Sequence, residues 1–278
     1  MTKFSNLIRQ QPVVLIAFII VCGFLIMAVF GQWIAPYDYA AQDTSSKLTP
    51  SSREHLLGTD QFGRDILSRI IVGSRDVGMI AGSSTIIAVM LGTLLGLSSG
   101  YIGGLLDEVL MRFLDVLVSI PVTLLAMVIL GTVGPSRKNI VLVVGILFSG
   151  MIARVVRSSV LDLKTRQFVE AAKLRGETSL YITTREILPN VLPTIAVEGS
   201  MRFSYAIFLV ASLGFLGLGI QPPNPDWGLM VSEARDWYAQ APWVLYTPAI
   251  AVAILVVSIS IVSDALNKLL TPGGVSES

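Results

Sequence analysis

Six apolar runs, each long enough to cross a lipid bilayer, dominate this sequence. A bilayer core of about 30 Å needs roughly 20 apolar residues in a helix, which satisfies its backbone hydrogen bonds without water. Only 14% of the residues are charged, against roughly a quarter in soluble domains. The sequence therefore predicts an all-α polytopic membrane protein with six transmembrane helices. The runs cover residues of about 12–34, 77–101, 110–133, 140–160, 194–220 and 244–267.

The first and third runs carry further local signals. The first has about 23 apolar residues, more than the roughly 7–15 of a signal peptide, and no A-x-A cleavage site follows it. We therefore expect a retained first span. Pro121 lies inside the third run, where it predicts a kink because proline removes a helical hydrogen bond.

The distribution of Lys and Arg favours one orientation. If the N-terminus is cytoplasmic, most of the basic residues fall in cytoplasmic segments, and they are concentrated between the fourth and fifth runs. Short cytoplasmic loops of membrane proteins are enriched in these residues. The sequence thus predicts that both termini are cytoplasmic (N-in, C-in).

The composition argues against several classes of function. A net charge of +1 provides no field for binding nucleic acid. The single cysteine, Cys22, and the single histidine, His55, cannot form an ordinary His/Cys metal site. The chain lacks the G-x-x-x-x-G-K-[ST] pattern of a P-loop. We expect neither catalysis nor a bound cofactor or metal in this chain.

Small residues recur along one face of the second run. Ala88, Gly92, Gly96 and Gly100 are spaced four residues apart, so they share a helix face. Small side chains at this spacing let a second helix approach closely. This pattern predicts tight helix packing rather than a substrate site.

The polar segment FVEAAKLRGETSLYITTREILPNVLP, residues 168–193, separates the fourth and fifth runs. Its first part favours helix, Gly176 is expected to end that helix, and Thr178 can cap a second one. An apolar stripe that includes Leu180 and Ile187 follows, and Pro189 is expected to prevent further helix before the next span. The pattern predicts a compact helix-turn-helix that docks a partner; an amphipathic loop on lipid headgroups is the alternative.

This segment resembles the EAA loop of ABC-importer permeases, with the pattern E-A-A-x3-G-x9-I-x-L-P, although Glu186 stands in place of the isoleucine. Four further stretches resemble permeases of the dipeptide/oligopeptide/nickel type: WIAPYD, LLGTDQFGRDILSRIIVGSR, YIGGLLDEVLMRFLDVLVSIP and GFLGLGIQPPNPDWGLMVSEARDW. Together they reach from the first span to the last. The residues that match the EAA pattern are Glu170, Ala171, Ala172, Gly176, Leu188 and Pro189.

The resemblance implies a type I ABC-importer fold, with cytoplasmic coupling helices in an EAA loop of about residues 161–193. It implies a bacterial cytoplasmic membrane protein that works with a similar second permease, two cytoplasmic ATPases that bind ATP and Mg²⁺, and a periplasmic or lipid-anchored binding protein. Glu170 would orient the coupling helix on the ATPase. Residues 1–76 would form an N-terminal helix and an extracytoplasmic loop with an amphipathic helix, and residues 77–278 the transport domain.

The resemblance leaves the cargo open. Di- or oligopeptides are the first expectation, and a nickel chelate, a sugar or an opine are alternatives. An ion-coupled secondary transporter and a membrane-embedded enzyme are competing classes. In the loop before the second run, Asp60, Arg64 and Asp65 are candidates for docking the binding protein, with interfacial anchoring as the alternative.

Overall fold

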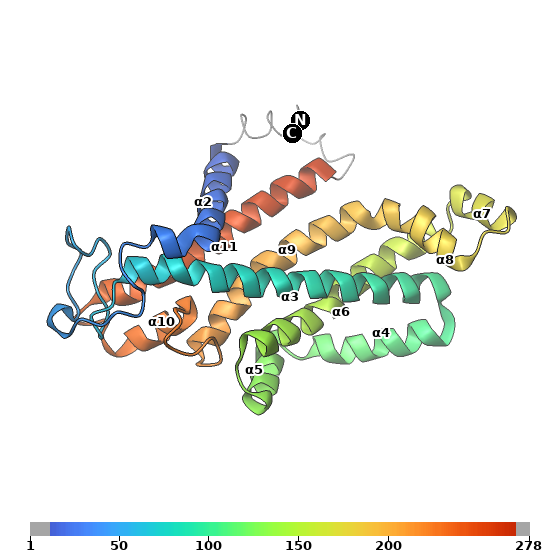
Figure 1. Cartoon of the computed structure of the whole chain (residues 1–278). Coiled ribbons are helices and arrows are strands. Elements are labelled where there is room, and N and C mark those ends of the chain that lie inside the picture. Colours follow the sequence, from blue (N-terminus) through green and yellow to red (C-terminus); the bar gives the residue numbers. More distant parts are fainter. Residues whose placement is uncertain (1–11, 271–278) are drawn as a thin grey trace.

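The structure, a computed structural model, describes residues 12–270 and is built from helices (Figure 1). This confirms the predicted all-α class. Apart from one isolated bridge between Thr59 and Asp65, the described residues contain no β-structure. The α-helices are α2 (Pro12–Ile34), α3 (Ile66–Ile102), α4 (Gly104–Ser119), α5 (Val122–Val133), α6 (Arg137–Leu163), α7 (Gln167–Leu174), α8 (Ser179–Tyr181), α9 (Leu188–Phe215), α10 (Trp227–Glu233) and α11 (Pro242–Leu270).

Five helical segments in the described part of the chain are long and apolar enough to span a membrane, or six if α4 and α5 count as one broken span. The kink expected at Pro121 is confirmed, but the third run is not one helix: α4 and α5 meet at 89°. Ile120 has an extended backbone, with φ −88° and ψ 132°. The residue before a proline is driven out of the helical region by the proline ring, and this breaks the run.

The second span begins earlier than the hydropathy indicates. Asp65 caps α3 by accepting a hydrogen bond from the Ser68 amide at 2.7 Å, so the helix starts at Ile66. The expected division after residue 76 therefore falls inside a continuous helix. Residues 66–76, expected as an amphipathic helix before the second span, form the first turns of that span. Capping, a local hydrogen bond, determines this start more sharply than average hydropathy does.

The helices α3 and α6 form the most extensive helix pair, and glycines allow their close approach. A Cβ atom on Gly96 would lie 2.6 Å from the Ala153 carbonyl oxygen, closer than atoms can pack. Gly92 and Gly100 meet the backbone and branched side chains of α6 in the same way. The small-residue face found in the sequence therefore lies along this contact.

Two ion pairs hold α4 against the same helix, α6. The guanidinium of Arg157 donates to both carboxylate oxygens of Asp107, at 2.5 and 2.6 Å. One helical turn away, Arg154 pairs with Asp115 at 2.8 Å. The two residues of each pair are about 40 or 50 positions apart in sequence. These ion pairs therefore stabilise the contact between α4 and α6 and not a single helix.

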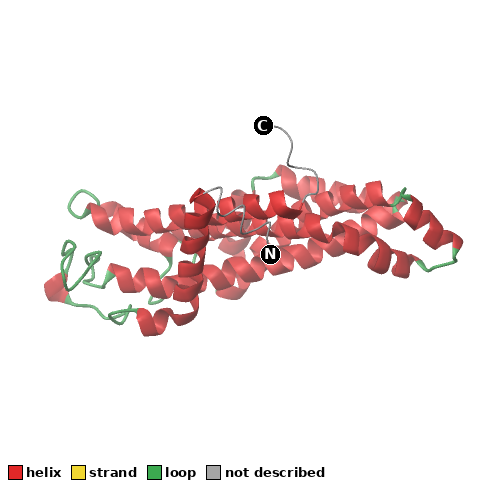
Figure 2. Ribbon diagram, turned by 90° about the horizontal axis from the view of Figure 1, so that it is seen from above, coloured by secondary structure: helices red, strands yellow, loops and turns green. Residues whose placement is uncertain are grey.

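The polar parts of the chain gather at the two ends of α3 (Figure 1). The loop of residues 35–65 and α10 lie at its N-terminal end, and α7 and α8 lie at its C-terminal end. Figure 2 shows the same separation from above, with most of the loops at the two ends of the helical body. Lys164, just after α6, donates to the Tyr101 carbonyl oxygen at 2.6 Å and so ties the second end together.

Candidate functional site

The segment 161–193 folds as a helix, a sharp turn and a second helical arm. Gly176 has φ +79°, a conformation that glycine adopts without strain. Its amide donates to the Lys173 carbonyl at 3.0 Å, and the Glu177 amide donates to the Ala172 carbonyl at 3.2 Å. These two bonds form a Schellman motif that ends α7. Thr178 then caps the second arm by accepting a hydrogen bond from the Tyr181 amide at 3.2 Å, as predicted.

The second arm runs into the fifth span without a break, which corrects the expectation that Pro189 stops the helix. A π-helical stretch, Ile182–Ile187, joins α8 to α9, and Pro189 lies in the first turn of α9. Proline has no amide hydrogen to donate, and the wider π-helical turn directly before it leaves room for its ring. From Ser179 to Phe215 the chain forms one apolar helical segment of 37 residues. The second arm and the fifth span are therefore parts of one continuous helical segment.

The inner face of the segment is a small hydrophobic core. Val169 and Ala172 from α7 pack with Ile182 and Ile187 from the π-helical stretch, and all four are at most 1% exposed. The predicted apolar stripe is therefore divided: Ile187 faces inward, whereas Leu180 faces outward. The widened π-helical turn shifts the register, so the 3.6-residue period used in the prediction fails here. Burial of Ala172 gives it a packing role.

The outer face of the segment is an exposed tip that combines charge with apolar surface. Glu170 and Ala171 are exposed on α7. Leu174 is 90% exposed and Leu180 is 74% exposed. These two leucines present apolar surface at the end of a polar loop. Of the EAA-pattern residues, Leu188 is half-buried and Pro189 is exposed at the start of α9.

An ion pair links the two arms of this segment. Arg175, at the end of α7, donates to the Glu186 carboxylate at 3.2 Å and lies 3.8 Å from Glu177. Glu186 is the residue that departs from the EAA pattern. The departure therefore replaces an apolar side chain with a charge that has its own partner eleven residues away.

The three residues predicted to dock a binding protein are buried in the 35–65 loop and its junction with α3. Asp60 is 3% exposed and its carboxylate accepts from Nε of Arg64 at 2.6 Å, from Arg69, and from two backbone amides. Arg64 also reaches Glu233, the last residue of α10, at 3.2 Å. Asp65 caps α3 and binds Nδ1 of His55 at 2.9 Å. Their side chains are enclosed by the loop and its junction with α3, and their hydrogen bonds hold the loop in shape.

Gly63 makes this compact loop possible. It has φ +76°, and a Cβ atom at this position would collide with the Asp43 carbonyl. Ser45 and Ser46 donate hydrogen bonds to the Asp43 carboxylate, and these bonds lower the pKa of that carboxyl to about 2. The motif GTDQFGRD thus forms a tight turn around Asp60. From the sequence alone, the charged residues of this motif were interpreted as a docking surface.

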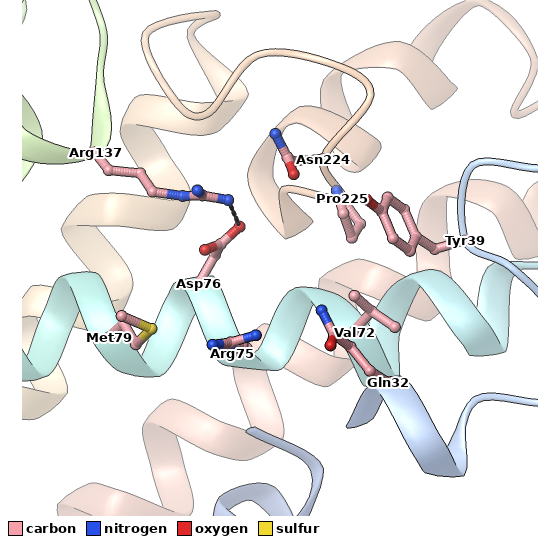
Figure 3. A pocket seen from close by; sticks show the side chains of 9 residues that line it. All are labelled: Gln32, Tyr39, Val72, Arg75, Asp76, Met79, Arg137, Asn224 and Pro225. Atoms are coloured by element: carbon pink, nitrogen blue, oxygen red, sulfur yellow. Dashed lines mark hydrogen bonds and ion pairs between the residues drawn. The ribbon is translucent and has the colours of Figure 1, made fainter. Parts of the chain in front are cut away.

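A polar pocket of about 320 Å³, which the sequence did not reveal, lies at the same end of the molecule (Figure 3). Arg137, at the start of α6, donates to Asp76 on α3 at 2.8 Å. Residues 12–270 contain no cluster of three or more His, Cys, Asp or Glu able to hold a metal ion. The sequence did show two adjacent charged residues of this pocket, Arg75 and Asp76. The second span was expected to begin at residue 77, so both were assigned to the segment before it. The polar side chains that line the pocket are Gln32, Tyr39, Arg75, Asp76, Arg137 and Asn224.

Comparison with known proteins finds matches along most of the chain. Residues 92–273 match the family described as "Binding-protein-dependent transport system inner membrane component", and residues 7–50 match the "N-terminal TM domain of oligopeptide transport permease C". The dipeptide transport system permease protein DppC of Alkalihalophilus pseudofirmus is 36% identical over 95% of this chain and 87% of its own length. The glutathione transport system permease protein GsiD of Pectobacterium atrosepticum is 38% identical, over 97% and 90%.

Solved structures share the fold. Two inward-facing crystal forms of the MetNI methionine ABC transporter superimpose with TM-scores of 0.58 and 0.54, at 21% and 20% sequence identity. The first covers 74% of this chain and 98% of the transporter chain, and the second covers 70% and 94%. At this identity the likeness concerns the fold alone.

Proposed function

The chain belongs to the family of binding-protein-dependent transport system inner membrane components, the multi-pass permeases of bacterial ABC importers, and we propose that its cargo is a di- or oligopeptide. The similarity to permeases named for dipeptides and for glutathione, itself a peptide, supports this cargo. Membership of this family favours ATP-driven uptake over an ion-coupled carrier. Uptake assays with the complete transporter test the proposal: labelled dipeptides are expected to accumulate, whereas a nickel chelate, a sugar and an opine are not. Accumulation of one of the latter alone would refute it.

The ATPase-coupling site is proposed to be the exposed tip of the segment 161–193. The exposed Leu174 and Leu180 provide apolar contact, and Glu170 beside them provides a charge for orientation. The single observation that carries this assignment is the continuity of the second arm with α9. An ATPase that moves the tip would thereby move a span, with no flexible linker to absorb the motion.

The partners follow from this division of labour. We propose that two cytoplasmic ATPases bind and hydrolyse ATP, that one of them receives the tip of this chain, and that a second, similar permease completes the pathway. A binding protein would deliver cargo at the opposite end of α3, where the 35–65 loop and α10 lie. Asp60, Arg64 and Asp65 would support that docking indirectly, by holding the shape of the loop.

A bulky residue on the tip tests the coupling site. Ala171→Trp places an indole on the exposed face of α7 and should lower ATP-driven uptake several-fold, with the amount of assembled permease in the membrane unchanged. Ala41→Trp, at an exposed position in the 35–65 loop, is the matched control. Gly176→Pro should uncouple the complex more severely, because φ +79° is inaccessible to proline. Normal uptake in Ala171→Trp would argue against the assignment.

The proposed orientation places both termini and the tip in the cytoplasm. In a variant that lacks Cys22, a single cysteine at Leu174 should react with a membrane-impermeant maleimide only in inside-out vesicles. A cysteine at Ala41 should react only in right-side-out vesicles. Reversal of the two results would overturn the orientation and, with it, the assignment of the tip to a cytoplasmic ATPase.

A further inference from the structure

We propose that the polar pocket at the N-terminal end of α3 binds the C-terminal carboxylate of the transported peptide, with Arg75 as the residue that recognises it. This inference rests on the proposed peptide cargo. Under the orientation given above, the pocket lies on the side from which the cargo enters. Its lining residues on α3 lie between 72 and 79, near the start of that helix, whereas α7 and α8 lie at the other end of α3 (Figure 1).

The charges in the pocket favour an anion. Two guanidinium groups, those of Arg75 and Arg137, line it together with the single carboxylate of Asp76. Asp76 already accepts a hydrogen bond from Arg137 at 2.8 Å, and its side chain is only 14% exposed. Arg75 is exposed and has no hydrogen bond or ion pair with any residue in the described range 12–270. Because the charges of Asp76 and Arg137 cancel, the unpaired guanidinium of Arg75 gives the pocket a net charge of +1.

The pocket is assembled by tertiary structure and so has a defined shape. Arg75 and Asp76 come from α3, Arg137 from the start of α6, and Asn224 from the connection between α9 and α10 (Figure 3). Tyr39 closes it from the segment after α2. The pair of Asp76 and Arg137 joins α3 to α6 across 61 residues of sequence. A volume of about 320 Å³ lies at the lower end of the range for small-ligand sites.

A second cavity explains why the anion would belong to a peptide rather than to a free inorganic ion. This cavity, of about 440 Å³, is mostly apolar and lies between α2, α3 and α9. Gln32, Arg75 and Met79 line both cavities, so the guanidinium stands at their junction. Phe24 and Phe203 are among the apolar residues of the second cavity. A ligand with a carboxylate next to an apolar side chain, such as the C-terminal residue of a peptide, matches both.

A guanidinium suits this task because it can donate two parallel hydrogen bonds to a carboxylate. A peptide ammonium finds no equivalent partner, since Asp76 is already bound to Arg137. A hydrogen bond to a charged group contributes about 1.5–3 kcal/mol, which corresponds to roughly tenfold or more in affinity. The permease is therefore expected to prefer a free C-terminal carboxylate independently of the binding protein.

Direct binding to the purified permease–ATPase complex, without the binding protein, tests this inference. The probes are alanyl-phenylalanine and its C-terminal amide, titrated while tryptophan fluorescence or heat is recorded. The wild-type complex should bind the carboxylate form about tenfold more tightly than the amide. Arg75→Gln should remove that preference. Arg53→Gln, at an exposed arginine in the 35–65 loop, should retain it.

A second variant, expected to change the preference for the free carboxylate in the opposite direction, makes the test stringent. Asp76→Asn removes the only carboxylate of the pocket and releases Arg137, so the preference for the free carboxylate should rise. A merely structural role of this cluster predicts loss of binding in both variants, not opposite changes. The inference is overturned if wild type shows no preference, if Arg75→Gln keeps it, or if Asp76→Asn lowers it.

The outcomes also separate this inference from the proposed cargo. If the complete transporter with its binding protein imports no peptide, the proposed cargo is wrong. If it imports peptides but the complex shows no preference for the carboxylate, only the role of Arg75 is wrong. If Arg75→Gln leaves peptide binding unchanged and lowers stimulation of the ATPases by the binding protein, Arg75 contacts that protein and the inference fails.

Discussion

Replacement of Asp60 by alanine should destabilise the permease strongly, even though Asp60 lies in a loop. The carboxylate accepts from Arg64 Nε at 2.6 Å and from Arg69, and it also accepts from the backbone amides of Phe62 and Arg64 at 2.8 and 2.9 Å. The side chains of Arg64 and Arg69 are only 6% and 3% exposed. Removing the acid leaves two guanidinium groups in the interior with one carboxylate fewer.

The magnitude follows from the cost of an uncompensated buried charge. Breaking a buried ion pair by removing one partner costs about 3–5 kcal/mol. Glu233 remains 3.2 Å from Arg64 and retains part of the compensation. We therefore expect about 3 kcal/mol, the lower end of the range. For a chain of this size that loss lowers the midpoint of thermal unfolding by roughly 6–12 °C.

The assay is thermal unfolding of the detergent-solubilised permease, followed by size-exclusion chromatography or intrinsic tryptophan fluorescence. Glu54→Ala is the matched control, because Glu54 is an exposed acid of the same loop. Its loss should change the midpoint by no more than about 1–2 °C, as surface substitutions contribute within about 0.5 kcal/mol. Peptide uptake by Asp60→Ala should fall together with the amount of folded protein.

One result would refute this reasoning. If Asp60→Ala unfolds at the same temperature as Glu54→Ala and selectively loses ATPase stimulation by the binding protein, then Asp60 contacts that protein directly. The burial of Asp60 in the isolated chain would then not describe the assembled transporter.

Two further perturbations test other parts of the structure. Gly96→Val should lower the free energy of unfolding by about 1–3 kcal/mol, because the larger side chain forces α3 away from α6. Gly131→Ala should be neutral or stabilising in the same thermal unfolding assay, since no atom lies within 4 Å of a new Cβ at that position. Equal effects of the two substitutions would contradict the close contact. Glu186→Gln weakens a half-exposed ion pair with Arg175, so ATP-driven uptake should change less than threefold at low salt. A loss of uptake as complete as that of Gly176→Pro would show that Glu186 itself contacts the ATPase.

The exposed tip illustrates what local sequence can predict and where it fails. The Schellman turn at Gly176 and the cap at Thr178 involve residues within five positions, and both could be read from the sequence. The fate of Pro189 could not, because it depends on a π-helical stretch that shifts the register by part of a turn. Such a stretch has no simple periodic signature.

The apolar runs and the small-residue face determined the class of protein and which face of the second span packs tightly, whereas the tertiary structure decided that α6 is the partner. Hydropathy and the spacing of small residues are both properties of one continuous stretch of chain, so neighbouring residues suffice to reveal them. The burial of Asp60 and the pocket around Arg75 were decided only by tertiary structure. A charged side chain is exposed or buried according to partners far away in sequence, as with Arg64 and Glu233, which are 169 residues apart. Electrostatic free energy depends on distance and local dielectric, and the folded chain alone specifies both.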